Sequence, residues 1–380
     1  MDCKFLNHGM AIGYDSMVKP CCEWSRDSSW NNYNHINKID LVTWHNSKPL
    51  EQARDQLANG IWPDSCIRCS RSESQNRSSM RLDGLSAYDH YGQEDITLEI
   101  RPGAVCNFAC QTCWPMASTR VAQFHHQAGI LDIKQVVSPS VDDYTFLSPI
   151  AHRIRDLVIL GGEPFYDKNC LNFLYWAVDN LTARITLFTN GSAVDWDWID
   201  QYPGKIILVF SIDAIGKPAE YIRFGTDWSV VEQNLRRAQD HPRVELRINI
   251  TQTVYNYYYI SDIIDLLVKC WPAVVMFGLP QETYFQEHVV PIKYRKEIID
   301  KLSNAVEQIQ QADVESGQKS HATNALNSVI SNLQSKPWNP DAYNKFKKFV
   351  TDMDRVKHIN IGDYCEFVAD MLSEQPVEIL

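Results

Sequence analysis

The sequence lacks any apolar run long enough to cross a lipid bilayer, which takes about 20 consecutive apolar residues in a helix. Its first residues, 1–8, also lack the basic start and apolar core of a secretory signal peptide. Positive charge is in deficit, because 36 Lys and Arg stand against 47 Asp and Glu, a formal net charge of −11. That balance argues against a broad basic surface for nucleic acid or an anionic membrane. We therefore expect a cytoplasmic protein with neither of these as its partner.

No internal repeat is evident, and 44% of the 380 residues are hydrophobic, enough for one large domain and a smaller one. Cysteine, by contrast, is plentiful, with eleven residues. A reducing compartment keeps thiols free, so clustered cysteines in a chain without an export signal are better explained as metal ligands than as disulfides.

The tightest cluster is the CxxxCxxC pattern of Cys106, Cys110 and Cys113, which follows a strand-like run at 96–100. Spacings of four and three residues let one loop wrap three corners of a cubic iron-sulfur cluster, whereas structural zinc usually takes four ligands. One iron would then stay open to a small molecule. Three nearby cysteines could also form a partial zinc site or remain as buried thiols.

Short apolar runs typical of strands recur through the middle of the chain, at 96–100, 156–160, 184–188, 205–210, 244–250 and 274–277. Longer helical or linking segments separate them. This alternation predicts βαβ units and a parallel sheet, whose functional loops follow the carboxyl ends of the strands. The predicted fold class is therefore α/β.

A CxxxCxxC loop after the first strand of such a sheet resembles the radical S-adenosylmethionine (radical SAM) superfamily. The resemblance implies a partial (β/α)6 TIM-like barrel with a catalytic [4Fe-4S] cluster on Cys106, Cys110 and Cys113. It also implies that SAM binds the open iron and is reductively cleaved to methionine and a 5′-deoxyadenosyl radical, which abstracts hydrogen from a substrate. An electron donor such as a flavodoxin or a ferredoxin would be a further partner.

The loop after the second predicted strand supplies another match. Its residues are Gly161, Gly162, Glu163 and Pro164. Glycines there let the backbone approach a ligand, and the glutamate offers a carboxylate to an ammonium group. The sequence resembles the family's GGEP motif, which contacts the amino group of SAM. A structural turn between a strand and a helix is the alternative.

Short polar residues also follow the third and fourth predicted strands. The candidates for SAM binding in this region are Thr189, Asn190, Ser211, Asp213 and Arg223. The resemblance assigns Ser211 and Asp213 to the ribose or carboxylate region of SAM. The guanidinium of Arg223 could pair with the methionine carboxylate. Turn or capping roles are the alternative for these residues.

A second group of cysteines precedes the barrel. Cys66 and Cys69 form a CxxC knuckle, and residues 13–22, predicted as a β-hairpin, lead into Cys21 and Cys22. With Cys3 the group has the ligand count of a four-cysteine site, which permits either structural zinc or a closed [4Fe-4S] cluster.

This arrangement resembles the twitch domain, a shortened SPASM domain with one auxiliary [4Fe-4S] cluster. The implied ligands are Cys3, Cys21, Cys66 and Cys69. The auxiliary cluster could accept the electron left after hydrogen abstraction. Cys22 competes with Cys21 for its place, and the distance along the chain from Cys66 favours Cys21. In twitch and SPASM enzymes the domain commonly follows the barrel, whereas here it precedes it.

The last hundred residues show helical periodicity, interrupted at 308–320 by a stretch rich in Gln, Ser and Ala that we expect to be a flexible connection. Three parts are therefore predicted. They are a cysteine-rich α+β twitch-like domain at 1–92, a radical SAM core at 93–282 and a helical C-terminal extension at 283–380.

The expected activity is that of a radical SAM enzyme acting on an unidentified peptide or small molecule. One rival is a non-catalytic zinc or iron-sulfur protein in which the cysteines serve only as structural ligands. Another is an electron-transfer protein with two clusters, which would bind iron and leave SAM intact. Neither rival needs polar residues at the strand ends, so those residues favour the enzyme.

Overall fold

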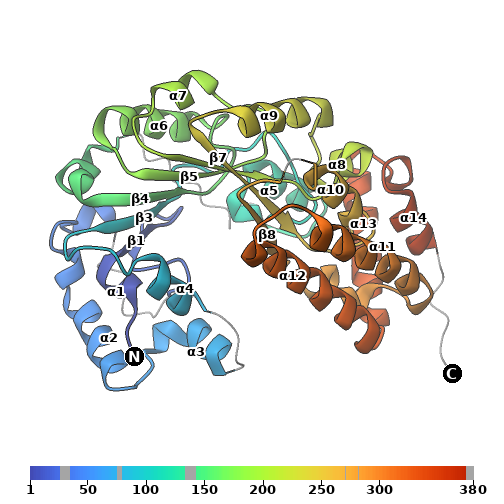
Figure 1. Ribbon diagram of the computed structural model, residues 1–380, viewed down its shortest axis with the longest axis horizontal. Coiled ribbons are helices and arrows are strands. Elements are labelled where there is room, and N and C mark those ends of the chain that lie inside the picture. The colour runs from blue at the N-terminus through green and yellow to red at the C-terminus, as the bar shows by residue number, and fades with distance from the viewer. Residues whose placement is uncertain (26–34, 75–78, 133–142, 270, 281, 374–380) are drawn as a thin grey trace. The chain divides into compact units, whose positions relative to one another are not determined.

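The computed structural model describes residues 1–25, 35–74, 79–132, 143–269, 271–280 and 282–373. Within these ranges eight strands follow the order β2-β1-β3-β4-β5-β6-β7-β8 in one sheet (Figure 1). Their bounds are Gly9–Ile12 (β1), Val18–Lys19 (β2), Ile96–Ile100 (β3), Ile154–Ile159 (β4), Arg184–Thr189 (β5), Ile206–Ser211 (β6), Val244–Thr251 (β7) and Val274–Gly278 (β8).

Parallel pairs form between β1 and β3, β3 and β4, β4 and β5, and β7 and β8. The predicted α/β class is confirmed, and β3 to β8 match the six predicted strands to within two residues at either end. The predicted hairpin is also present, because β1 and β2 pair antiparallel, with Ala11 opposite Lys19. It begins four residues earlier than expected, at Gly9 rather than Gly13.

Strand burial explains why the sheet could be predicted. From Ile206 to Phe210 every residue of β6 is buried, as expected for a strand of a parallel sheet that is covered on both faces. In β4, Leu157 and Ile159 are fully buried, whereas Arg155 near the start of the strand is exposed. Continuous apolar runs of this length are visible in the sequence itself.

Helices surround the strands. Their bounds are Lys4–His8 (α1), Lys48–Ala58 (α2), Ile67–Ser74 (α3), Met80–Ala87 (α4), Thr119–Gln127 (α5), Lys168–Asn180 (α6), Trp196–Gln201 (α7), Gly216–Ile222 (α8), Trp228–Asp240 (α9), Ile260–Leu267 (α10), Ile292–Gln311 (α11), Ser316–Ser335 (α12), Pro340–Lys357 (α13) and Glu366–Ser373 (α14). Side-chain caps fix several of their starts: Ser118 accepts from Val121 N in α5, and Asn339 accepts from Ala342 N in α13.

The predicted helical C-terminal extension is confirmed by α11 to α14. The flexible connection expected at 308–320 is wrong. The helix α11 continues to Gln311, and α12 already begins at Ser316. Ala, Gln and Lys are good helix formers, so a polar composition did not prevent helix formation here.

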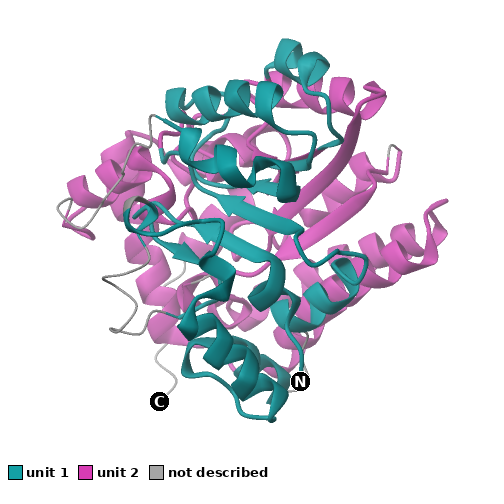
Figure 2. Ribbon diagram, turned by 90° about the vertical axis from the view of Figure 1, so that its left-hand side faces the viewer, with its two compact units in different colours: residues 1–104, 137–187, 195–206 teal, residues 105–136, 188–194, 207–380 magenta. Residues whose placement is uncertain are grey.

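Two compact units are coloured separately in Figure 2. Unit 1 comprises residues 1–104, 137–187 and 195–206, and unit 2 comprises 105–136, 188–194 and 207–380. The first holds β1 to β4 and α1 to α4, and the second holds β7, β8 and α8 to α14. The three-part division at residues 92 and 282 stays a prediction.

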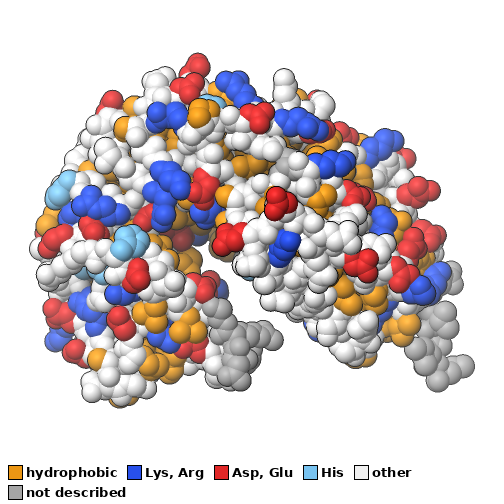
Figure 3. Space-filling model, in the orientation of Figure 1, with side chains coloured by type: hydrophobic (Ala, Val, Ile, Leu, Met, Phe, Trp, Pro, Cys, Tyr) orange, Lys and Arg blue, Asp and Glu red, His pale blue; other side chains and the backbone are white. Residues whose placement is uncertain are grey.

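Figure 3 shows how charged side chains are distributed on one face of the molecule. On the face drawn in Figure 3, basic and acidic side chains are interspersed. None of the helices in the described ranges is long and apolar enough to span a membrane.

Candidate functional site

Cys106, Cys110 and Cys113 lie in one loop of unit 2, between β3 and α5. Cys110 is buried and the other two are partly buried. Burial raises the pKa of Cys113, and the neighbouring Cys110 and Cys106 thiols raise it further. The three predicted ligands therefore lie close enough together in this loop for their charges to interact.

The backbone of this loop is held by residues at and just after the end of α8. Ala109 N donates to Phe224 O at 2.7 Å, and Gln111 N donates to Ile222 O at 2.7 Å. The Gln111 side chain adds a bond from Nε2 to Tyr221 O at 3.2 Å. Cys110 thus lies between two residues whose amides are both fixed.

Asn190, a predicted site residue, does face the cysteine loop. Its Nδ2 donates to Asn107 Oδ1 at 2.9 Å and lies 3.8 Å from Cys106 Sγ. Asn107 Nδ2 in turn donates to Ser192 Oγ at 2.8 Å. Thr189 serves the adjoining turn, since its Oγ1 accepts from Gly191 N at 3.0 Å. Sequence reasoning missed Asn107 and Ser192, although both are polar neighbours of predicted residues.

Asp213 and Arg223 form a buried ion pair in the same unit. Arg223 Nη1 donates to Asp213 Oδ2 at 2.7 Å, and Asp213 Oδ1 accepts from Thr251 N at 2.8 Å. Burial lowers the pKa of the Arg223 guanidinium, but Cys110 and Asp213 outweigh it and raise that pKa. Arg223 therefore lies close to the cysteine loop.

One donor of Arg223 remains available for a ligand. Its Nε is buried and has no hydrogen-bond partner among the described residues. A buried donor without a partner costs free energy, on the order of 1–3 kcal/mol, which an anionic ligand would relieve. Ser211, the last residue of β6, is half-buried.

Gly161 to Pro164 follow β4 and belong to unit 1. Gly161 has φ 135°, and a Cβ there would lie 2.4 Å from Gly103 O. Gly162 N donates to the same carbonyl at 3.1 Å. The Glu163 side chain is buried, and its backbone carbonyl accepts from Asp167 N. The turn role is thus evident, while a contact of this segment with SAM stays a prediction.

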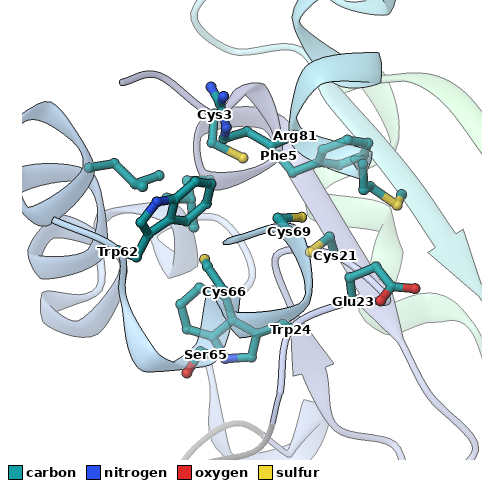
Figure 4. Close-up of a pocket in the computed structure, with 13 residues that line it drawn as sticks. Cys3, Phe5, Cys21, Glu23, Trp24, Trp62, Ser65, Cys66, Cys69 and Arg81 are labelled. Carbon is teal, nitrogen blue, oxygen red and sulfur yellow. The ribbon is translucent and has the colours of Figure 1, made fainter. Parts of the chain in front are cut away.

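Four of the N-terminal cysteines line one pocket in unit 1. Figure 4 shows the sulfur atoms of Cys3, Cys21, Cys66 and Cys69 converging on it from separate segments of the chain. Burial raises the pKa of Cys21, and the thiols of Cys22, Cys3, Cys66 and Cys69 raise it further. The remaining lining is largely apolar, including Phe5, Trp24, Leu57 and Trp62.

Cys22 points elsewhere. Its Sγ donates to Met80 Sδ at 3.6 Å. Burial and the Glu99 carboxylate together raise the pKa of Cys22 to about 12. Cys22 does not line the pocket formed by the other four cysteines, which favours Cys21 as the fourth pocket thiol.

A cation borders the four-cysteine pocket. Arg81 lines it, is 8% exposed and is fixed by two bonds to Glu73, Nη2 to Oε2 at 2.5 Å and Nε to Oε1 at 2.9 Å. The charges of Cys3 and Cys69 act on Arg81, which places the guanidinium near those thiols. A positive charge beside converging thiols suits an anionic metal centre.

No three or more Cys, His, Asp or Glu side chains within the described ranges are arranged to share a single metal ion. A cubic cluster makes a different demand, because each thiolate binds a different iron and the sulfurs stay further apart. The all-thiolate donor sets of both sites suit iron-sulfur clusters, and the four-thiolate set also suits zinc.

Among the described residues, two further cysteines take no part in these groups. Cys170 and Cys365 are buried, as single thiols without metal spacing are expected to be. Cys270 lies outside the described residues.

No protein-family model matches the chain, and no curated protein matches it. The fold is similar to native anSMEcpe with bound AdoMet, at 17% identity over 57% of this chain and 61% of that chain, with a TM-score of 0.39. It is also similar to SuiB of Streptococcus suis bound to S-adenosylmethionine, at 15% identity over 70% of this chain and 59% of that chain, with a TM-score of 0.37.

A third similar structure is TYW1 with a lysine-pyruvate adduct bound, at 13% identity over 72% of this chain and 94% of that chain, with a TM-score of 0.36. The chain spans 61% of the length of the first of these structures and 59% of the second. At these TM-scores the likeness assigns neither a reaction nor a substrate.

Proposed function

We propose that the chain is a radical SAM enzyme whose catalytic [4Fe-4S] cluster is held by Cys106, Cys110 and Cys113. One observation carries the proposal: a single loop presents three thiols and no fourth, with its backbone fixed on both sides of Cys110. When bound, the cluster and SAM would supply one-electron chemistry that ends in hydrogen abstraction from a substrate.

The chain's own polar residues suit the SAM side of this site. Asp213 holds the Arg223 guanidinium through Nη1, which leaves Nε for an anionic group such as a carboxylate. Asn190 orients Asn107 beside Cys106. Glu163, with Gly161, Gly162 and Pro164, is proposed as the contact for the SAM ammonium, and Ser211 and Thr189 as further cofactor residues.

A second centre is proposed at the four-cysteine pocket. Cys3, Cys21, Cys66 and Cys69 would hold an auxiliary [4Fe-4S] cluster of the twitch type. Their convergence, the apolar shell and the adjacent Arg81 support this proposal. The shell excludes water, which protects a cluster and influences its reduction potential.

The substrate is proposed to be a peptide or a small molecule. SuiB of Streptococcus suis has been solved bound to its precursor peptide SuiA. A flavodoxin or ferredoxin is proposed as the electron donor, and the cytoplasm as the location, in keeping with the oxygen-sensitive chemistry and the thiols.

The deciding experiment is anaerobic reconstitution, followed by iron and zinc analysis and by reduction with dithionite in the presence of SAM. Two [4Fe-4S] clusters correspond to about eight irons per chain. We expect 5′-deoxyadenosine from the wild type and none from Cys106→Ala. Cys66→Ala should lower the iron content by about half.

Cys170→Ala is the matched control, because this cysteine is buried and belongs to neither group. It should keep both the iron and the deoxyadenosine. Zinc in place of iron, together with intact SAM, would contradict the proposal and favour a structural protein. Two clusters with intact SAM would favour electron transfer instead.

A further inference from the structure

A lysine from the C-terminal extension reaches the cysteine loop. Lys357 is the last residue of α13, yet its Nζ donates to Ala109 O at 2.8 Å and to Gln111 Oε1 at 2.9 Å. These acceptors flank Cys110 on both sides. The two contacts join residues 248 and 246 positions apart in the chain.

The ammonium group of Lys357 is buried. Lys357 is 6% exposed. Its Nζ also faces the rings of Phe224, at 5.3 Å from the centroid, and Phe124, at 5.7 Å. Burying a lysine costs free energy unless its N–H donors are hydrogen-bonded. The acceptors and the aromatic rings around Nζ therefore hold this side chain in its buried position.

A second connection ties the end of α13 to the same loop. Tyr221 donates from its hydroxyl to Asp354 Oδ1 at 2.7 Å, one helical turn before Lys357. The backbone carbonyl of Tyr221 accepts from Gln111 Nε2 at 3.2 Å. Gln111 therefore uses both ends of its amide, the oxygen toward Lys357 and the nitrogen toward Tyr221.

The charge of Lys357 also acts on the cysteines. Cys110 lies close enough to be influenced by two cations, Arg223 and Lys357. Of these, Arg223 is balanced by Asp213 at 2.7 Å. The hydrogen-bond acceptors of Lys357 are backbone and amide oxygens, which carry no formal charge. Burial lowers the pKa of Lys357, whereas Cys110 and the Asp354 carboxylate raise it.

We propose that Lys357 is a positioning residue of the proposed catalytic cluster, which holds the backbone on both sides of Cys110 and places a positive charge beside the cluster. This inference rests on the proposed function. Reduction adds a negative charge to the cluster, so a nearby cation favours the reduced form. The helical extension is thereby part of the site and sets how readily it accepts an electron.

The test compares Lys357→Met with Lys345→Met in the full chain. Lys345 is exposed on the same helix and makes the matched control. Hydrogen exchange of the 107–113 peptide in the protein as purified should quicken by about tenfold or more in Lys357→Met, because charge-assisted bonds to the loop are lost. The control should leave that exchange unchanged.

The second measurement is the midpoint potential of the reconstituted cluster, followed by EPR. We expect a lower midpoint in Lys357→Met, and a midpoint close to wild type in Lys357→Arg, which keeps the charge. If Lys357 only supported the fold, Lys357→Met and Lys357→Arg would have the same midpoint potential at equal iron content. If Lys357→Met misfolds, Gln111→Leu tests the contact alone, because it removes one acceptor of Lys357 and leaves both α13 and the positive charge in place.

Unchanged loop exchange and an unchanged midpoint in Lys357→Met would overturn the proposal. A wild type that takes up no cluster would refute the proposed function and the effect on potential with it. The exchange measurement would still decide whether Lys357 holds the loop, so the two failures are distinguishable.

Discussion

Adjacent cysteines have different surroundings at the N-terminal pocket. Cys21 faces three other thiols, whereas Cys22 contacts Met80 and Glu99. We predict that Cys21→Ser removes the metal of this pocket, about four irons per chain if it is a [4Fe-4S] cluster, because a four-thiolate site loses one ligand.

Cys22→Ser is the neighbouring control and should retain the wild-type metal content. Iron and zinc analysis of both variants after anaerobic reconstitution gives the answer. If Cys21→Ser keeps its metal while Cys22→Ser loses it, the assignment of Cys21 is wrong.

The cysteine groups could be proposed from the sequence because ligand chemistry is carried by side-chain type and spacing, and their metal binding stays a prediction. Asn190, which follows β5, and Arg223, which follows α8, both lie beside the cysteine loop. Lys357 and Gln111 were not predicted. Their contact depends on how a distant helix packs, and nothing in the local sequence of either residue marks it.

At the scale of elements, the turn after β4 depends on one glycine. Gly161 combines φ 135° with a carbonyl 2.4 Å from where a Cβ would lie. Gly161→Ala is expected to reduce the free energy of unfolding by about 2 kcal/mol or more, because it adds a clash to backbone strain. Urea unfolding followed by circular dichroism measures the loss.

Gly60→Ala separates the two causes. Gly60 has φ 78°, and nothing lies within 4 Å of a Cβ built there. The free energy of unfolding of this variant should fall only by the cost of the left-handed conformation, about 1 kcal/mol. Equal losses at the two positions would mean that the contact with Gly103 is relaxed at little cost.

Helices and strands could be predicted where the burial of their side chains leaves a simple pattern in the sequence. The strands of the parallel sheet are continuous apolar runs, so β3 to β8 were found within two residues. The stretch at 308–320 was assigned wrongly because polar surface helices lack such a run. Its residues are mostly exposed, and the helices there are fixed by packing through a few positions such as Ile309 and Thr323 nearby.

At the scale of the whole molecule, a buried histidine makes stability depend on pH. Burial lowers the pKa of His45 to about 4, and its Nε2 bonds to Gly9 O at 3.0 Å. Between pH 6.5 and about 4 the unfolded chain binds a proton at this position that the folded chain does not bind. Stability is therefore complete above pH 6.5 and falls as the pH is lowered toward 4, by up to about 3 kcal/mol.

Urea unfolding at several pH values between 7.5 and 4.5 measures this dependence. His45→Gln keeps a donor for Gly9 O and should make the curve less steep in this range. The remaining slope is expected from His125, whose pKa burial also lowers to about 4. His90→Gln is the control, since His90 is 66% exposed, and should follow the wild type. A wild-type curve that stays level below pH 6.5 would contradict the prediction.

The contacts around the two cysteine groups also determine which of the two groups can be completed first during translation. All four pocket cysteines lie within the first 69 residues, so that group is fully synthesised early. The loop at 106–113 is clamped by residues 221–224 and by Lys357, near the end of the chain. A ribosome that stops before residue 357 therefore releases a polypeptide with every cysteine of both groups, but without the last support of the loop that carries the chemistry.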